Sequence, residues 1–344
     1  MRRLLICLFC SALLVAEAHA QRLVTDSAGR VVNLPGTIER IFAAGPPASI
    51  FLYVLAPQTL LGWPRAPSPE EAAFLAPAVR DLPALGRLTG RGNTANIEVV
   101  LQAHPDLILD FGSTTATYVS LANRVQEQTG LPYLLIDGRL DNTAGSLLLL
   151  GGMLGVEERA ETLAGYADQV FTELDGVLAK IPPEQRPRVY FARGPEGLET
   201  GLRGSINTEI IERVGAVNVA DAPGQHGLAN VTLEQVLKWN PEVIITLDDR
   251  FYTRVQGDPL WQTLPAVQAG RVYLAPTLPF GWVDRPPSVN RLIGIQWLSR
   301  LFYPEHFADD LRTVTRNFYR LFYHLDPSAE QLDELLAHAG RRSP

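Results

Sequence analysis

Two segments of the chain share one pattern of apolar and polar positions. The sequences IEVVLQAHPDLIL (residues 97–109) and LEQVLKWNPEVII (residues 233–245) each begin with an aliphatic residue followed by Glu98 or Glu234. A short helical pattern follows, and then a proline, an acidic residue and three branched aliphatic residues. Because a proline disfavours helix in the residue before it, and a short apolar run is typical of a buried strand, each segment predicts a helix leading into a buried strand. This unit, found twice, predicts two similar α/β lobes with parallel sheets.

Shorter apolar runs elsewhere predict the remaining strands of the two sheets. These strands are expected at residues 40–44, 59–63, 133–136, 188–192 and 272–275. Between the lobes, apolar residues recur at helical spacing from residue 157 to residue 180, and Pro182 and Pro183 end the pattern. About two dozen residues at 1.5 Å each make a helix of about 35 Å, which is long enough to cross from one lobe to the other.

The predicted fold class is therefore α/β, with two lobes that each hold a central, mostly parallel sheet and one long, rigid helix that joins them. The first lobe is assigned to residues 21–152, the connecting helix to residues 153–182 and the second lobe to residues 183–344. The second lobe ends in a helical pattern at residues 311–336, whose aromatic residues we expect to pack in the core. A chain of 344 residues exceeds the usual limit of about 250–300 for one hydrophobic core, which agrees with two lobes.

Residues 1–20 have the pattern of a secretory signal peptide. Arg2 and Arg3 precede an apolar run, and Ala18 and Ala20 form a small-residue cleavage site. The apolar run is shorter than the ~20 residues that span a bilayer. We therefore expect a periplasmic protein, secreted through a cleavable signal peptide and not inserted directly into the membrane.

The composition of the remaining chain excludes several classes of function. Both cysteines, Cys7 and Cys10, lie in the predicted signal peptide, so the mature chain has no disulfide, thiolate nucleophile or thiolate metal site. The full chain has a formal net charge of −7 and no clustered positive charge, which argues against a nucleic-acid partner. The sequence has no G-x-S-x-G, H-E-x-x-H or phosphate-loop motif, and its histidines lack metal-ligand spacing. We expect neither an enzyme nor a cofactor or metal of the protein's own.

The stretch FGWVDRPPSVNRL (residues 280–292) is an unusual loop near the end of the chain. It combines aromatic residues, among them Trp282, with the charged pair Asp284 and Arg285 and two consecutive prolines, all ahead of a helical pattern. Prolines fix the backbone and keep the residue before them out of the helical region, so this stretch predicts a stiff loop. Arg291, at the start of a helix with an apolar face, is expected to be structural.

Together, the signal peptide, the two α/β lobes, the single crossing helix and the repeated segment resemble the class III periplasmic solute-binding proteins of ABC importers. This family includes ferric-siderophore, cobalamin and haem binding proteins, and the resemblance covers nearly the whole chain after residue 40. It implies a monomer with a ligand cleft between the lobes, bounded by loops at the carboxyl ends of the strands. In this family one glutamate per lobe docks onto arginines of the permease dimer in the membrane. By position in the repeated segment, these correspond to Glu98 and Glu234, although the helix dipole alone also favours an acid there.

The resemblance also places several loops of this chain at the cleft, including Trp63-Pro64-Arg65. The expected ligand-binding residues are Pro46, Arg91, Tyr190, Arg193, Arg203, His226, Trp282 and Arg285. Guanidinium groups form paired hydrogen bonds with carboxylates, phenolates and oxyanions. A cleft that holds several arginines therefore predicts an anionic ligand. Trp282, and Tyr190 with it, is expected to stack on an aromatic chelator.

The ligand class predicted first is an anionic metal complex, a ferric siderophore of catecholate or carboxylate type. The same arginines also suit a bare oxyanion such as molybdate or tungstate, or the propionates of haem. A corrinoid is disfavoured, because residues 88–93 are rich in glycine and arginine where cobalamin binders place an aromatic residue. A periplasmic sensor or accessory protein of the same fold, without a transport role, is a further alternative.

The docking role of Glu98 and Glu234 predicts the outcome of a double substitution. Replacing both with alanine should reduce uptake of the ligand to background, because the protein loses its charged contacts with the permease, and should leave ligand affinity unchanged. Uptake is measured in cells with labelled ligand, and affinity with the purified protein. Uptake that survives the double substitution would favour the sensor or accessory function.

Overall fold

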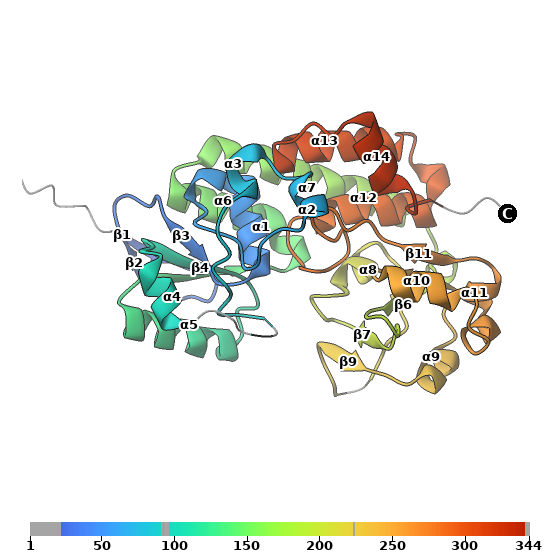
Figure 1. The fold of residues 1–344 in the computed structure, drawn as a ribbon. Helices are drawn as coiled ribbons and strands as arrows, with labels where there is room; N and C mark the ends of the chain where they lie inside the picture. Colours follow the sequence, from blue (N-terminus) through green and yellow to red (C-terminus); the bar gives the residue numbers. More distant parts are fainter. Residues whose placement is uncertain (1–21, 91, 93–95, 223, 341–344) are drawn as a thin grey trace, which may run out of the picture.

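The computed structural model describes residues 22–90, 92, 96–222 and 224–340, so the predicted signal peptide and Arg91 lie outside the described residues. Two α/β lobes lie side by side beneath a layer of long helices (Figure 1). The first lobe is drawn in blue and teal and the second mainly in yellow and orange. The predicted fold class is confirmed.

The first lobe is built on a parallel sheet in the order β3-β4-β5, in which Ile41 lies opposite Leu107. An antiparallel β1–β2 hairpin stands beside this sheet. The elements of this lobe are β1 (Arg22–Thr25), β2 (Val31–Leu34), β3 (Ile41–Ala43), α1 (Pro46–Leu55), the 3-10 turn η1 (Pro57–Thr59), α2 (Pro69–Ala72), α3 (Pro77–Arg80), α4 (Ile97–Gln102), β4 (Leu107–Gly112), α5 (Ala116–Thr129), β5 (Tyr133–Asp137), η2 (Leu140–Asn142) and α6 (Thr143–Leu154).

The second lobe is built on a parallel sheet in the order β11-β10-β6-β8, in which Ile244 lies opposite Val272. A short antiparallel pair, β7 and β9, stands beside it. The elements that follow the first lobe are α7 (Glu157–Leu178), η3 (Pro183–Gln185), β6 (Arg188–Ala192), β7 (Glu199–Gly201), α8 (Glu209–Arg213), β8 (Val217–Asn218), β9 (Leu228–Asn230), α9 (Leu233–Trp239), β10 (Val243–Thr246), α10 (Asp249–Val255), η4 (Trp261–Thr263), α11 (Pro265–Gln268), β11 (Val272–Leu274), α12 (Arg291–Phe302), η5 (Pro304–His306), α13 (Leu311–Tyr323) and α14 (Ala329–Leu336).

The repeated sequence pattern forms the same unit in both lobes. The first copy folds into α4 and β4, and the second into α9 and β10. Asn96 caps α4 and Thr232 caps α9, each through a side-chain oxygen that accepts a hydrogen bond from a backbone N–H of the first turn. Both strands lie inside their sheets with neighbours on either side, which explains their continuous apolar runs.

The prediction of a strand at residues 59–63 is wrong. The chain meets the first sheet there in a single bridge, between Leu60 and β3. Gly62 lies so close to a neighbouring segment that a Cβ on it would come within 2.5 Å of the carbonyl oxygen of Pro83. Pro64 has no N–H to donate to a ladder. The chain therefore leaves the sheet after one bridge.

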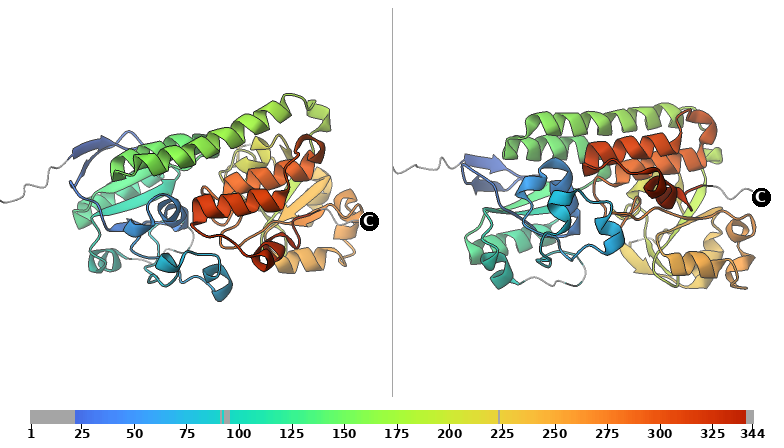
Figure 2. Two further views of the ribbon diagram at one scale, coloured as in Figure 1. Left: turned by 90° about the horizontal axis from the view of Figure 1, so that it is seen from above. Right: turned by 45° about the horizontal axis from the view of Figure 1, so that its top comes forward.

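The long helix predicted between the lobes is α7, which runs alongside both of them (Figure 2). Its 22 residues correspond to about 33 Å. Its buried residues recur every three or four positions, at Ala160, Leu163, Ala164, Ala167, Val170, Leu174 and Val177. Tyr166 of α7 packs against Phe318 and Phe322 of α13, with ring centroids 5.9 and 5.3 Å apart. The aromatic residues of the C-terminal helix pattern are core residues, as predicted.

One hydrophobic core extends through both lobes. Alternate residues of a strand point to opposite faces of its sheet. One face of each sheet, with Ile41 in the first lobe and Val189 in the second, belongs to a single cluster that also includes α1, α7, α12 and α13. The other faces form two separate clusters, with Phe42 in the first lobe and Tyr190 in the second. The helical layer therefore covers one face of both sheets and joins the lobes through apolar packing.

Arg291 joins the two lobes through polar contacts. It is the first residue of α12, and 1% of its side chain is exposed. Nη1 lies 2.8 Å from Glu209 Oε1 in the second lobe, and Nη2 donates to the carbonyl oxygen of Gly138 in the first lobe at 2.6 Å. Glu209 also accepts a hydrogen bond from the backbone N–H of Leu140. The predicted structural role of Arg291 is confirmed, and the structure adds that this residue fixes the lobes relative to each other.

Arg291→Ala is expected to lower the free energy of unfolding by about 3–5 kcal/mol, because it removes a side chain that is 1% exposed and leaves the Glu209 carboxylate and the Gly138 carbonyl oxygen without this donor. Arg250→Ala is the matched control, since Arg250 pairs with Asp248 through a side chain that is 75% exposed. That change should cost less than about 1 kcal/mol. Denaturant unfolding of the two variants measures both values. Equal costs would show that the junction contributes no more than a surface pair.

Candidate ligand-binding cleft

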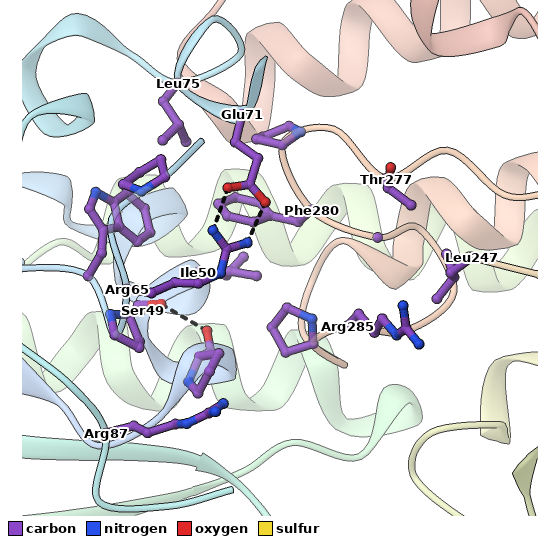
Figure 3. A pocket seen from close by; sticks show the side chains of 17 residues that line it. Ser49, Ile50, Arg65, Glu71, Leu75, Arg87, Leu247, Thr277, Phe280 and Arg285 are labelled. Carbon is purple, nitrogen blue, oxygen red and sulfur yellow. Dashed lines mark hydrogen bonds and ion pairs between the residues drawn. The ribbon is translucent and has the colours of Figure 1, made fainter. Parts of the chain in front are cut away.

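A cavity of about 610 Å³ lies between the two lobes (Figure 3). Its first wall comes from the start of α1, the segment between Trp63 and Leu75, and Arg87. Its second wall comes from Leu247 and from the loop that follows β11. The cavity thus stands at the carboxyl ends of β3, β10 and β11, where open α/β sheets commonly bind ligands.

The first wall begins at the turn between β3 and α1. Pro46 and Pro47 occupy the first two positions of α1, where a missing N–H costs no hydrogen bond. Gly45 precedes them, and a Cβ on it would come within 2.5 Å of Thr89 Oγ1, so this close approach requires glycine. Ser49 Oγ donates to the carbonyl oxygen of Pro46 at 2.9 Å. Pro46 therefore lines the cavity, where the sequence placed it.

Arg65 and Glu71 form an ion pair on the first wall. Arg65 Nη1 donates to Glu71 Oε2 at 2.7 Å, and Nη2 donates to Oε1. This fork raises the pKa of Arg65, since the carboxylate favours the charged guanidinium. Glu71 also completes a capping box at the start of α2, where it accepts a hydrogen bond from the backbone N–H of Ser68.

The second wall includes the stretch FGWVDRPPSVNRL, whose side chains point both into the cavity and into the core. Phe280 and Arg285 line the cavity, while Trp282 and Asp284 are buried on the other side. Arg285 has a φ of 65°, a conformation that is uncommon for a residue with a Cβ. The loop thus holds an exposed guanidinium in a costly backbone conformation at the edge of the cleft.

Trp282 anchors this loop and does not reach the cavity. Its ring is fully buried, and its Nε1 lies 3.3 Å from Tyr319 Oη of α13. Gly294 of α12 packs against it so closely that a Cβ there would come within 1.9 Å of the Trp282 carbonyl oxygen. The expectation that Trp282 stacks on a ligand is corrected, because the shared helical layer covers the ring. Phe280 is the aromatic residue of this loop that faces the cavity.

Arg193 forms ion pairs with two carboxylates of the second lobe. It pairs with Glu199, and its Nε lies 3.0 Å from Asp284 Oδ2. Asp284 is 1% exposed and also accepts a hydrogen bond from Asn207 Nδ2 at 2.9 Å. The expected contact between Arg193 and a ligand is corrected. A buried guanidinium needs a charge partner, and the loop supplies one in Asp284.

The structure places three further predicted ligand residues away from the cavity. Arg203 pairs with Asp221 at 3.1 Å, and both side chains are about half exposed. Tyr190 is buried in the core on the outer face of the second sheet, where its hydroxyl donates to the carbonyl oxygen of Gly197 at 2.8 Å. His226 is exposed in the segment before β9. For the described residues, the structure brings Pro46 and Arg285 together at the cleft and leaves the others outside it.

Two arginines of the cavity were absent from the predicted site. Arg65 stands in the Trp63-Pro64-Arg65 loop that was expected at the cleft, and Arg87 immediately precedes the loop at residues 88–93. Arg87 Nε donates to the carbonyl oxygen of Gly92 at 3.1 Å. Neither Arg87 nor Arg285 has a carboxylate partner among the described residues. The cavity therefore carries more positive than negative charge.

A buried carboxyl group supports the loop that begins at Arg87. Asp110, at 4% exposure, lies 3.2 Å from Thr89 Oγ1 and 3.3 Å from Tyr133 Oη. Burial raises the pKa of Asp110 to about 6, against the lowering effect of these hydrogen bonds. The backbone N–H groups of Leu88 and Thr89 donate to the carbonyl oxygen of Ala44. The base of this loop is thus fixed to the end of β3.

In the part of the chain that the structure describes, no group of three or more His, Cys, Asp or Glu side chains could hold a metal ion. Across those same residues, no helix combines the length and apolar character needed to cross a membrane.

Glu98 and Glu234 occupy equivalent positions on the two lobes. Each is the second residue of its helix, α4 or α9, and each is exposed. Both helices lie on the side of the molecule opposite the α13 and α14 layer (Figure 1). The role of these glutamates in permease docking stays a prediction.

The two-lobed architecture and the interlobe cleft define a class of solute-binding proteins, and the sequence comparisons assign the chain to it. Residues 76–278 match the periplasmic binding protein family, so the chain belongs to that family. It is a class III periplasmic binding protein of ABC importers. The family and its structural neighbours are solute-binding proteins, not enzymes.

Individual relatives cover nearly the whole chain. The Molybdate-binding protein MolA of Haemophilus influenzae is 27% identical over 93% of this chain and 95% of its own length. The solved structure of an ABC transporter solute binding protein from Sulfurospirillum deleyianum is 31% identical, with a TM-score of 0.83, over 92% of this chain and 99% of that one. The solved structure of the Haemophilus influenzae MolA with bound molybdate has a TM-score of 0.73 at 24% identity, over 89% of this chain and 99% of that one.

Trp282→Ala is expected to lower the free energy of unfolding by about 3–5 kcal/mol, because it empties a fully buried site. Arg285→Ala, three positions along the same loop, should change it by less than about 1 kcal/mol, since this side chain is exposed. Denaturant unfolding of both variants provides the measurement. A Trp282→Ala protein as stable as the wild type would contradict the buried position of the ring.

Proposed function

We propose that this protein captures a compact oxyanion of the molybdate or tungstate type in the interlobe cleft and delivers it to an ABC importer. The observation that carries this proposal is the pair of guanidinium groups, Arg87 from the first lobe and Arg285 from the second, that line one cavity without carboxylate partners among the described residues. Guanidinium N–H groups form strong, charge-assisted hydrogen bonds with oxyanions and stay charged at any relevant pH. The Haemophilus influenzae relative named for molybdate binding, similar over nearly the full length, supports the oxyanion over the other anions.

A ferric siderophore, the ligand class predicted first from the sequence, remains the second candidate. The cavity of about 610 Å³ is larger than one tetrahedral oxyanion needs. Trp63 and Phe280, whose ring centroids lie 6.0 Å apart, give it an aromatic side on which a catecholate could stack.

Delivery to the membrane would use the paired lobes. Glu98 and Glu234 each present an exposed carboxylate on matching helices, so two permease subunits could each contact one lobe. The junction at Arg291 and the shared core hold the two carboxylates at a nearly fixed separation. This arrangement favours a role in transport over a sensor role, because a sensor of the same fold would not need two matched carboxylates.

Calorimetric titration of the purified protein with molybdate, tungstate, sulfate and a ferric catecholate tests the proposal. We expect molybdate and tungstate to bind with a Kd of about 1 μM or lower, near −8 kcal/mol. Arg87→Ala and Arg285→Ala should each weaken this binding by about 10- to 100-fold, because each removes a charge-assisted contact of about 1.5–3 kcal/mol. Arg203→Ala is the matched control and should leave the affinity unchanged, since Arg203 does not line the cavity.

The other outcomes separate the candidates. Tight binding of the ferric catecholate, with no binding of the bare oxyanions, would replace the first candidate with the second. Binding of neutral or cationic complexes alone would contradict an anionic ligand altogether.

A further inference from the structure

Glu71 is the single carboxylate among the described residues that line the cavity. Both of its oxygens face the guanidinium of Arg65, and the remaining cavity arginines lie apart from this pair (Figure 3). Glu71 therefore neutralises one of the three guanidinium groups that line the cavity, Arg65, Arg87 and Arg285. For the attraction of anions this carboxylate is unfavourable, because it offsets the positive charge of Arg65.

The carboxylate of Glu71 is fixed in position. Its Oε2 accepts hydrogen bonds from the backbone N–H of Ser68 at 2.8 Å and from Arg65 Nη1 at 2.7 Å. In return, Ser68 Oγ accepts a hydrogen bond from the backbone N–H of Glu71 at 3.2 Å. Of the Glu71 side chain 19% is exposed, against 69% for Arg65. The carboxylate cannot turn away from an incoming anion without breaking the cap of α2.

We infer that Glu71 is a specificity-determining residue, which limits the charge and size of the anion that the cleft accepts. The inference rests on the proposed function. A compact dianion can bind beside Arg87 and Arg285 without approaching Glu71. A larger anion of higher charge extends to the part of the first wall that holds Arg65 and Glu71, where it meets the fixed carboxylate and finds Arg65 already paired.

Coulomb repulsion predicts how the charge of Glu71 affects the affinity for anions of different charge and size. Repulsion by a fixed carboxylate grows with each negative charge of the ligand and falls with its distance. Removing the charge of Glu71 should therefore help a large trianion far more than a small dianion. A purely structural role of Glu71 predicts no such difference, since a disturbed wall would weaken both ligands alike. Rejection by an unfavourable charge is a common way for binding sites to gain specificity.

Glu71→Gln tests the inference, because glutamine keeps the capping box and removes the charge. The probes are molybdate as the compact dianion and citrate, in mildly alkaline buffer, as the larger trianion. Glu70→Gln is the matched control. Glu70 is the preceding residue of α2, and its carboxylate accepts a hydrogen bond from Ser68 Oγ outside the cavity lining. Thermal melting of both variants confirms that they fold.

We expect Glu71→Gln to tighten citrate binding by about 10-fold and to change molybdate binding by less than about 3-fold, with neither affected by Glu70→Gln. Unchanged or weaker citrate binding in Glu71→Gln, or the same gain in Glu70→Gln, would overturn the inference. The wild-type titration decides the proposed function separately. If the wild type binds no anion, a gain of citrate binding in Glu71→Gln would still support the role of Glu71, and no gain would overturn it.

Discussion

The buried guanidinium of Arg291 is the interaction on which the geometry of the cleft depends. It contacts Glu209 of the second lobe and the Gly138 carbonyl oxygen of the first, at the start of a helix that itself belongs to the shared core. A buried cation of this kind keeps its position because every alternative leaves a charge without a partner. Since the same core also includes α7, the lobes share one packed body, and we expect their relative movement to be small.

A cleft whose walls move little has to obtain its affinity from groups that are already in place. The loop after β11 meets this requirement because some of its side chains are buried in the protein interior while others line the cavity. Trp282 is packed into the core, and Asp284 is paired with Arg193, so the backbone between and beyond them is fixed. Arg285 and Phe280 are then presented to the cavity with little freedom left to lose.

Burial separates the arginines with a structural role from those that are available to a ligand. Arg193 and Arg291 are buried, and each is paired with carboxylate or carbonyl groups of its surroundings. Arg87 and Arg285 lie at an open cavity, where water solvates them and an unpaired charge costs little. Arg65 is intermediate, because it is exposed and yet paired with Glu71. The cleft thus combines two cations that have no carboxylate partner among the described residues with one neutralised cation, and the inference on Glu71 rests on this difference.

The amino-acid sequence by itself determined the fold class, because the repeated helix-strand unit and the spacing of apolar residues in α7 are local patterns. It also predicted a stiff loop at residues 280–292, since prolines act on their own neighbours. It could not determine which side chains of that loop reach the cleft. Trp282 and Arg193 lie where α13 and Asp284 place them, and these partners are distant in sequence. Within the part of the chain that the structure describes, the tertiary structure alone decided which arginines lack a carboxylate partner, because that depends on the carboxylates that folding brings beside each of them.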